Sequence, residues 1–120
     1  MKNKTNLKAA FTLVEIMIVV AIIGLLAAIA IPNFVRARTT AQMNACINNL
    51  RQIDGAIQLW ALEQKKDTTA GVGEADVLPY LKNSVTCPSG GTTFGDSYTI
   101  TTVAASARCA RVPSTHKLPP

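Results

Sequence analysis

Aromatic residues are scarce in this chain of 120 residues, where they make up only 5% of the sequence. The large aliphatic residues are concentrated in the first third, so the C-terminal half can bury only a small hydrophobic core. A domain with so small a core usually needs an additional staple. The length itself allows no more than one domain.

Side chains that commonly carry chemistry are also few. His116 is the one histidine, and none of the three cysteines forms a Cys-x-x-Cys pair, so the sequence lacks the usual spacing of zinc ligands. No paired carboxylates, Ser/His/Asp set or Gly-rich phosphate loop stands out. These absences predict a protein that is not an enzyme and that holds neither a metal nor a cofactor.

The net charge of +5 could indicate nucleic-acid binding, but its placement argues against that function. Lys2, Lys4 and Lys8 precede a long apolar run with no acid among them, and the remaining nine basic residues face seven acids. Positive residues beside a membrane span stay on the cytoplasmic side. The sequence therefore predicts a cytoplasmic N-terminus rather than a surface for nucleic acid.

The apolar run is long enough to cross a membrane. Residues 16–31 are apolar without a break, and the wider stretch 11–35 has only four polar or helix-breaking exceptions. As a helix, this stretch is about 37 Å long and can span a hydrocarbon core of about 30 Å. A strand of this length is implausible, and lipid requires the backbone to satisfy its own hydrogen bonds. The exceptions are Thr12, Glu15, Pro32 and Asn33.

Helical periodicity continues beyond the apolar run. Residues 36–66 have apolar side chains at three- and four-residue steps, with polar side chains between them, and this pattern predicts an amphipathic helix that ends within residues 62–66. The expected apolar stripe is Met43, Cys46, Ile47, Leu50, Ile53, Ile57, Trp60 and Ala61. The expected opposite face is Asn44, Asn48, Asn49, Arg51, Gln52, Asp54 and Gln58.

Residues 67–120 predict a small head with β-structure, so the fold class is α+β. The alternation in residues 97–103 predicts a strand, and residues 107–112 are its expected antiparallel partner. The other expected elements are a short helical turn or extended segment at 76–81, a turn at 87–91 and an extended tail at 113–120.

The cysteines could supply the staple if the head is exported. Cys87 opens the expected turn and Cys109 lies on the expected partner strand, so we expect a disulfide between them, with Cys46 a free thiol on the helix. This disulfide closes a loop of 23 residues, and the chain-entropy model gives a stabilisation of about 3 kcal/mol for such a loop. Pairing of Cys46 with one of the others is the alternative, and a cytosolic head would leave all three reduced.

The segment Lys8–Glu15, with the apolar run that follows it, resembles the N-terminus of type IV pilins and type II secretion pseudopilins. The resemblance implies that residues 1–10 are a leader, cut between Ala10 and Phe11 by a prepilin peptidase, and that the new amine of Phe11 is methylated. The family usually has Gly where this chain has Ala10.

Glu15 has two interpretations. It could form a capping box with Thr12, three residues earlier, at the positive end of the helix. The resemblance implies in addition that its carboxylate meets the amine of Phe11 in a neighbouring subunit. It also implies that the segment 24–32 loses helical structure when a subunit leaves the membrane. Gly24 and Pro32, at the two ends of this segment, both weaken a helix.

The predicted function is that of a structural subunit of a pilus or pseudopilus fibre. Residues 11–35 would form the fibre core, after a first stage as a single-pass inner-membrane protein. The implied partners are copies of this chain or related pilins, the prepilin peptidase, the inner-membrane assembly machinery and membrane lipid. Two alternatives remain: an ordinary secretory signal cut after the Ala28-Ile29-Ala30 sequence, and a plain membrane anchor.

Overall fold

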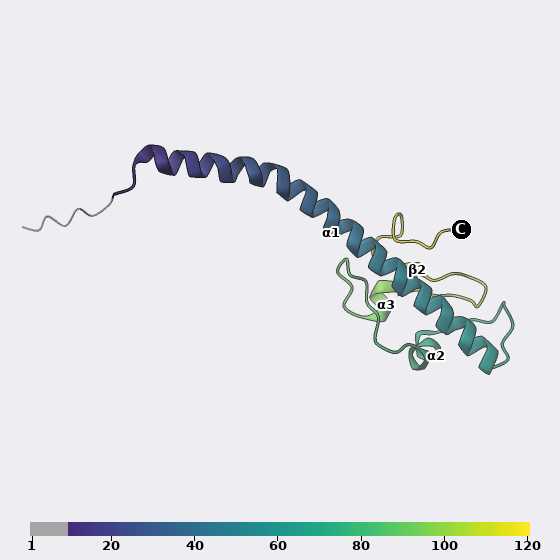
Figure 1. Ribbon diagram of the computed structural model, residues 1–120. Coiled ribbons are helices and arrows are strands. Elements are labelled where there is room, and N and C mark those ends of the chain that lie inside the picture. The colour runs from purple at the N-terminus through teal and green to yellow at the C-terminus, as the bar shows by residue number, and fades with distance from the viewer. Residues whose placement is uncertain (1–9) are drawn as a thin grey trace, which may run out of the picture. The chain divides into compact units, whose positions relative to one another are not determined.

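A computed structural model describes residues 10–120, so residues 1–9 of the expected leader lie outside the described part of the chain. The chain divides into two units, with the boundary between Ala37 and Arg38, and each is described by itself. The elements labelled in Figure 1 confirm a long N-terminal helix and a small head with a two-stranded antiparallel sheet. They are α1 (Leu13–Glu63), α2 (Glu74–Val77), a 3-10 helix η1 (Leu78–Tyr80), α3 (Phe94–Ser97), β1 (Tyr98–Thr99) and β2 (Arg108–Cys109).

Helix α1 begins with the expected capping box. The backbone N–H of Glu15 donates to Thr12 Oγ1 at 3.2 Å, and the N–H of Thr12 donates to Glu15 Oε2 at 2.9 Å. Two otherwise unpaired N–H groups at the helix start are thereby satisfied. The helix continues through Pro32, so the loss of helix between Gly24 and Pro32 stays a prediction about the fibre.

Helix α1 ends at Glu63, inside the range expected from the sequence. Lys65 adopts a left-handed conformation with φ of 51°. This bend lets the N–H of Lys66 reach the carbonyl of Ala61 at 2.8 Å, while Lys65 N–H donates to Leu62 O at 3.4 Å. These two bonds form a Schellman motif, which satisfies carbonyls in the last turn of the helix.

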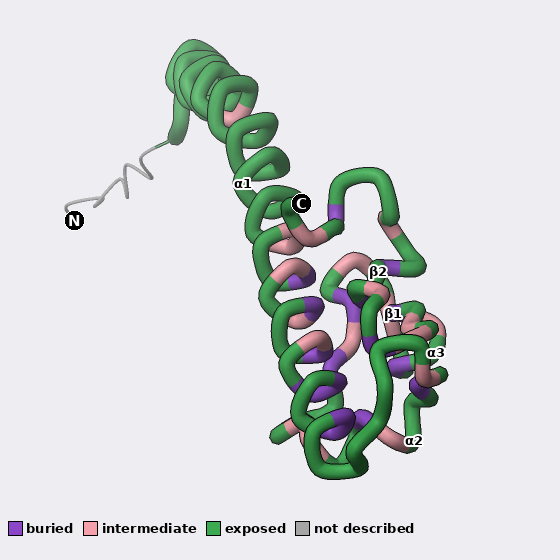
Figure 2. Tube along the Cα trace, turned by 90° about the vertical axis from the view of Figure 1, so that its right-hand side faces the viewer, coloured by how far each residue is buried: buried purple, intermediate pink, exposed green. Residues whose placement is uncertain are grey.

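The core of the second unit lies between the apolar stripe of α1 and the head. Figure 2 shows the buried positions following one face of this part of α1. From α1 the core receives Cys46, Leu50, Ile53, Ala56, Ile57, Trp60 and Ala61. From the head it receives Val72, Val77, Val85, Cys87, Phe94, Tyr98, Val103, Ala107 and Cys109.

Three polar residues of α1 differ from the sequence expectation. Asn49, Asp54 and Gln58 are predicted on the face opposite the apolar stripe, but each forms a hydrogen bond to the head. They lie at the border of the apolar stripe, where a polar side chain can reach the backbone of the head loops. The bonds are Asn49 Nδ2 to Thr86 O (3.1 Å) and Tyr98 Oη (2.9 Å), Ala107 N–H to Asp54 Oδ1 (2.8 Å), and Gln58 Nε2 to Val103 O (3.0 Å).

The expected strand at 97–103 is shorter in the structure. Ser97 closes α3, and β1 contains only Tyr98 and Thr99, which pair with Cys109 and Arg108 of β2. The second half of the expected strand pairs with a different segment: Val72 N–H donates to the carbonyl of residue 101 at 2.9 Å, and the N–H of residue 103 donates to the carbonyl of residue 70 at 3.1 Å. The two halves of this β-prone segment therefore pair with two different parts of the chain.

Candidate functional site

The expected cleavage site lies just before α1. Ala10 and Phe11 have no regular secondary structure and are exposed, with Phe11 83% exposed. Glu15, one turn further on, is also exposed, and one of its carboxylate oxygens accepts the Thr12 N–H. A carboxylate can accept more than one donor, so capping does not prevent Glu15 from meeting a cation.

The first part of α1 presents its apolar side chains outward. The large hydrophobic residues from Phe11 to Val35 are all at least 50% exposed within the chain itself. By length and composition, α1 is a helix that could cross a membrane. An apolar surface of this extent needs lipid or other protein chains to cover it.

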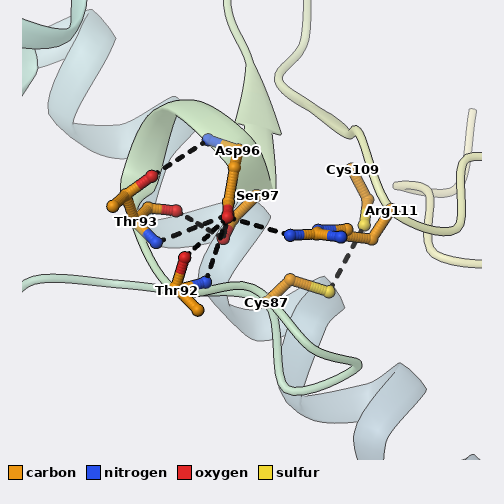
Figure 3. Close-up of polar contacts among 7 residues, drawn as sticks. All are labelled: Cys87, Thr92, Thr93, Asp96, Ser97, Cys109 and Arg111. Atoms are coloured by element: carbon orange, nitrogen blue, oxygen red, sulfur yellow. Dashed lines mark hydrogen bonds and ion pairs between the residues drawn. The ribbon is translucent and has the colours of Figure 1, made fainter.

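A second cluster lies within the head unit. Cys46 of α1, Cys87 of the turn, Cys109 of β2 and His116 of the tail are all buried, and each places a possible ligand atom within 4.8 Å of the other three. Cys87 Sγ is 3.6 Å from Cys109 Sγ and 4.0 Å from Cys46 Sγ, so the three thiols are free, since a disulfide bond is about 2.05 Å long. Figure 3 shows Cys87 and Cys109 facing each other.

The three thiols differ in acidity. Burial raises the pKa of Cys46 to about 12 and also raises the pKa of Cys87. Burial also acts to raise the pKa of Cys109, but the hydrogen bonds to its sulfur together outweigh burial; the largest is from the backbone N–H of Val112 at 3.4 Å, followed by that of the Cys87 thiol. The pKa of Cys109 is therefore lowered, and Cys109 is the thiol that loses its proton most readily of the three.

The turn that carries Cys87 depends on two glycines. Gly90 has φ of +105°, a conformation that side chains rarely adopt. A Cβ on Gly91 would lie 2.0 Å from Ser97 Oγ and 2.7 Å from the backbone nitrogen of Cys87. The close approach of this turn to α3 therefore requires glycine at position 91.

Comparison with known proteins bears on the N-terminal segment. Residues 5–31 match a family model described as the prokaryotic N-terminal methylation motif. The chain is 41% identical over 68 residues to the type IV major fimbrial protein FimA of Dichelobacter nodosus, covering 57% of this chain and 42% of that protein. It is 54% identical over 43 residues to the type IV major pilin protein PilA of Myxococcus xanthus, covering 36% of this chain and 20% of that protein.

This N-terminal segment is therefore similar to that of type IV pilins and of type II secretion pseudopilins. The pseudopilin side is represented by the type II secretion system core protein G of Escherichia coli, which is 30% identical over 82 residues, or 64% of this chain and 57% of that protein. The chain spans between a fifth and somewhat over half of the length of these relatives. No solved structure matches the chain.

The structure shows which of the predicted site residues lie close together. It brings Cys87 and Cys109 together, although their disulfide stays a prediction, and it adds Cys46 and His116, which sequence spacing did not connect. The tail is not extended throughout: His116 N–H donates to the carbonyl of Val112 at 3.0 Å, and this turn buries the imidazole. The only sequence signal for Cys46 was its place on the apolar stripe of α1.

Asp96 joins the segments that carry Cys87 and Cys109. Its carboxylate accepts hydrogen bonds from Thr92 Oγ1 at 2.8 Å and Ser97 Oγ at 3.0 Å, and it forms an ion pair with Arg111 at 2.9 Å (Figure 3). The Thr92 hydroxyl is the largest cause of a lowered pKa for Asp96, and the bonds from Ser97 and Arg111 act in the same direction. The charged carboxylate is therefore the form that the folded head favours.

We expect Asp96 to make the head sensitive to acid. Because its pKa is lower in the folded than in the unfolded chain, its contribution is complete above the unfolded pKa of about 3.9 and is lost as pH falls further. The measurement is the urea midpoint of the full-length chain in detergent, compared with Asp96→Asn. The midpoints should differ at pH 7 and converge as the pH is lowered below 4. A difference that stays constant down to pH 2 would contradict this role.

Proposed function

We propose that this chain is a structural subunit of a type IV pilus-like or type II secretion pseudopilus fibre and has no catalytic role. The observation that carries the proposal is the match of residues 5–31 to the methylation motif at the head of an exposed apolar helix. Relatives of both fibre types share this segment, so the proposal is for the fibre architecture that they have in common.

The apolar part of α1 would serve first in a membrane-bound form of the chain and then in an assembled form. In the first, it would hold the chain in the inner membrane as a single span, with the N-terminus in the cytoplasm. In the second, the inner-membrane assembly machinery would transfer the chain to a periplasmic or extracellular fibre made of copies of itself or related pilins. Helix packing then replaces lipid contacts, which gives no new hydrophobic driving force. Specific contacts must therefore set the register.

Glu15 and the processed N-terminus would supply one such contact. Prepilin peptidase would hydrolyse the Ala10–Phe11 bond and leave an amine on Phe11, which a methyl donor then methylates. A cation among apolar helices is costly unless it is paired. The Glu15 carboxylate of a neighbouring subunit offers that pairing, while Gly24 and Pro32 let the intervening helix open during assembly.

Processing gives a direct test of this proposal. We expect the mature chain, isolated from a host with a prepilin peptidase, to begin at Phe11 and to carry one methyl group on its amine. N-terminal mass spectrometry distinguishes three results. A start at Ile31 would instead support an ordinary secretory signal cut after the Ala28-Ile29-Ala30 sequence, and an intact Met1 would support a plain membrane anchor.

A further inference from the structure

We propose that Cys46, Cys87, Cys109 and His116 bind one Zn²⁺ ion as a closed structural site. The four residues come from α1, the 87–91 turn, β2 and the tail, and all four are buried. Three sulfurs and one imidazole nitrogen are a common ligand set for structural zinc. This inference concerns the second unit, residues 38–120, so it does not depend on fibre assembly.

The sulfur positions fit a tetrahedral centre. Zinc–sulfur bonds of about 2.3 Å at tetrahedral angles place neighbouring sulfurs about 3.8 Å apart. The distances from Cys87 Sγ to Cys109 Sγ and to Cys46 Sγ are 3.6 Å and 4.0 Å, on either side of that value. The spacing is thus that of ligands around a shared ion, and it is wider than the 2.05 Å of a covalent disulfide.

His116 provides an independent observation. Only 5% of this residue is exposed, and its Nδ1 has no hydrogen-bond partner among residues 10–120. A buried polar atom without a partner costs free energy, and an ion is one of the groups that can explain such an atom. The imidazole is held at the cluster by the turn that bonds His116 N–H to Val112 O.

A backbone group beside the sulfurs supports thiolate ligands. The N–H of Val112 donates to Cys109 Sγ at 3.4 Å. Such outer contacts orient metal ligands and stabilise their charge. On binding, the three thiols release three protons, so the ion with its ligands carries a net charge of −1. Four protein ligands leave no open position, which is typical of a structural rather than a catalytic site.

Zinc would provide the staple that the small head needs. It would join four segments of the chain, whereas the Cys87–Cys109 disulfide would join two. The two arrangements exclude each other, because oxidation to a disulfide removes two of the four ligands. Zinc ligation also gives Cys46 and His116 roles that the disulfide leaves unexplained.

The test uses the full-length chain, extracted from membranes in detergent without chelator and kept free of oxygen. Metal analysis should find about one zinc per chain, and alkylation with peptide mapping should find all three cysteines reduced. Replacement of zinc by Co²⁺ should give the visible bands of a tetrahedral site and sulfur-to-cobalt charge transfer in the near ultraviolet. Cys46→Ser and His116→Gln should each lower zinc affinity more than about 100-fold in chelator competition.

These two variants separate zinc from the disulfide, because both keep Cys87 and Cys109 able to pair. Asp54→Ala is the matched control: it removes a hydrogen bond between α1 and the head but no ligand, so it should keep one zinc per chain. A chain isolated with a Cys87–Cys109 linked peptide and no zinc would overturn the proposal, whatever the reduced chain binds later. Unchanged zinc affinity in Cys46→Ser and His116→Gln would overturn it as well.

Discussion

Fibre assembly should fail when Glu15 is replaced by leucine, while membrane insertion remains intact. Leucine removes a charge from an apolar helix, so insertion should be unchanged or improved. Assembly should fall at least about 10-fold, since a buried charge left without its counterion typically costs several kcal/mol. The measurement is the ratio of chain in sheared fibres to chain in membranes.

Glu15→Gln separates the two roles of this side chain. Glutamine can still accept the Thr12 N–H and complete the capping box, but it cannot neutralise the amine of Phe11. We therefore expect the glutamine variant to assemble as poorly as the leucine variant. Normal fibres from either variant would reduce Glu15 to a helix cap.

Truncation of Leu50 should strongly destabilise the core that α1 forms with the head. Leu50 is completely buried on the stripe of α1, and Leu→Ala at such a position typically costs 2–5 kcal/mol because the cavity does not fully close. Urea unfolding of the full-length chain in detergent measures this loss. The fluorescence of Trp60, the one tryptophan and itself part of the core, reports on the head.

Leu62→Ala provides a control on the same helix. Leu62 is 77% exposed within the chain, so this substitution should change the free energy of unfolding by less than about 0.5 kcal/mol. Equal losses from the two variants would mean that the head does not pack on α1 through the face that contains Leu50.

The sequence predicts α1 well because its evidence is local and repeated. Fifty-one residues of helix carry a continuous apolar run, an amphipathic stripe and a capping box, and each signal depends on neighbours within a few positions. Even the end of the helix was predicted within its range, although the left-handed Lys65 that closes it gave no signal.

The head was predictable only in part. Its strands are two residues long, and the β-prone segment after Ser97 divides between two partners, so alternation alone overestimated the strand. The sequence pattern places Asn49, Asp54 and Gln58 on the face opposite the apolar stripe, because periodicity records polarity and not the hydrogen bonds that a head loop can offer. The convergence of four chemically reactive residues is a tertiary event that spacing along the chain cannot show.

The most direct test of the central claim is immunoelectron microscopy of filaments from cells that produce this chain together with a complete assembly system. The antibody should recognise the head, residues 67–120. The fibre-subunit account predicts label on the filaments, and loss of that label when Glu15 is replaced by leucine. Processed chain that stays entirely in the membrane, with every filament unlabelled, would contradict it.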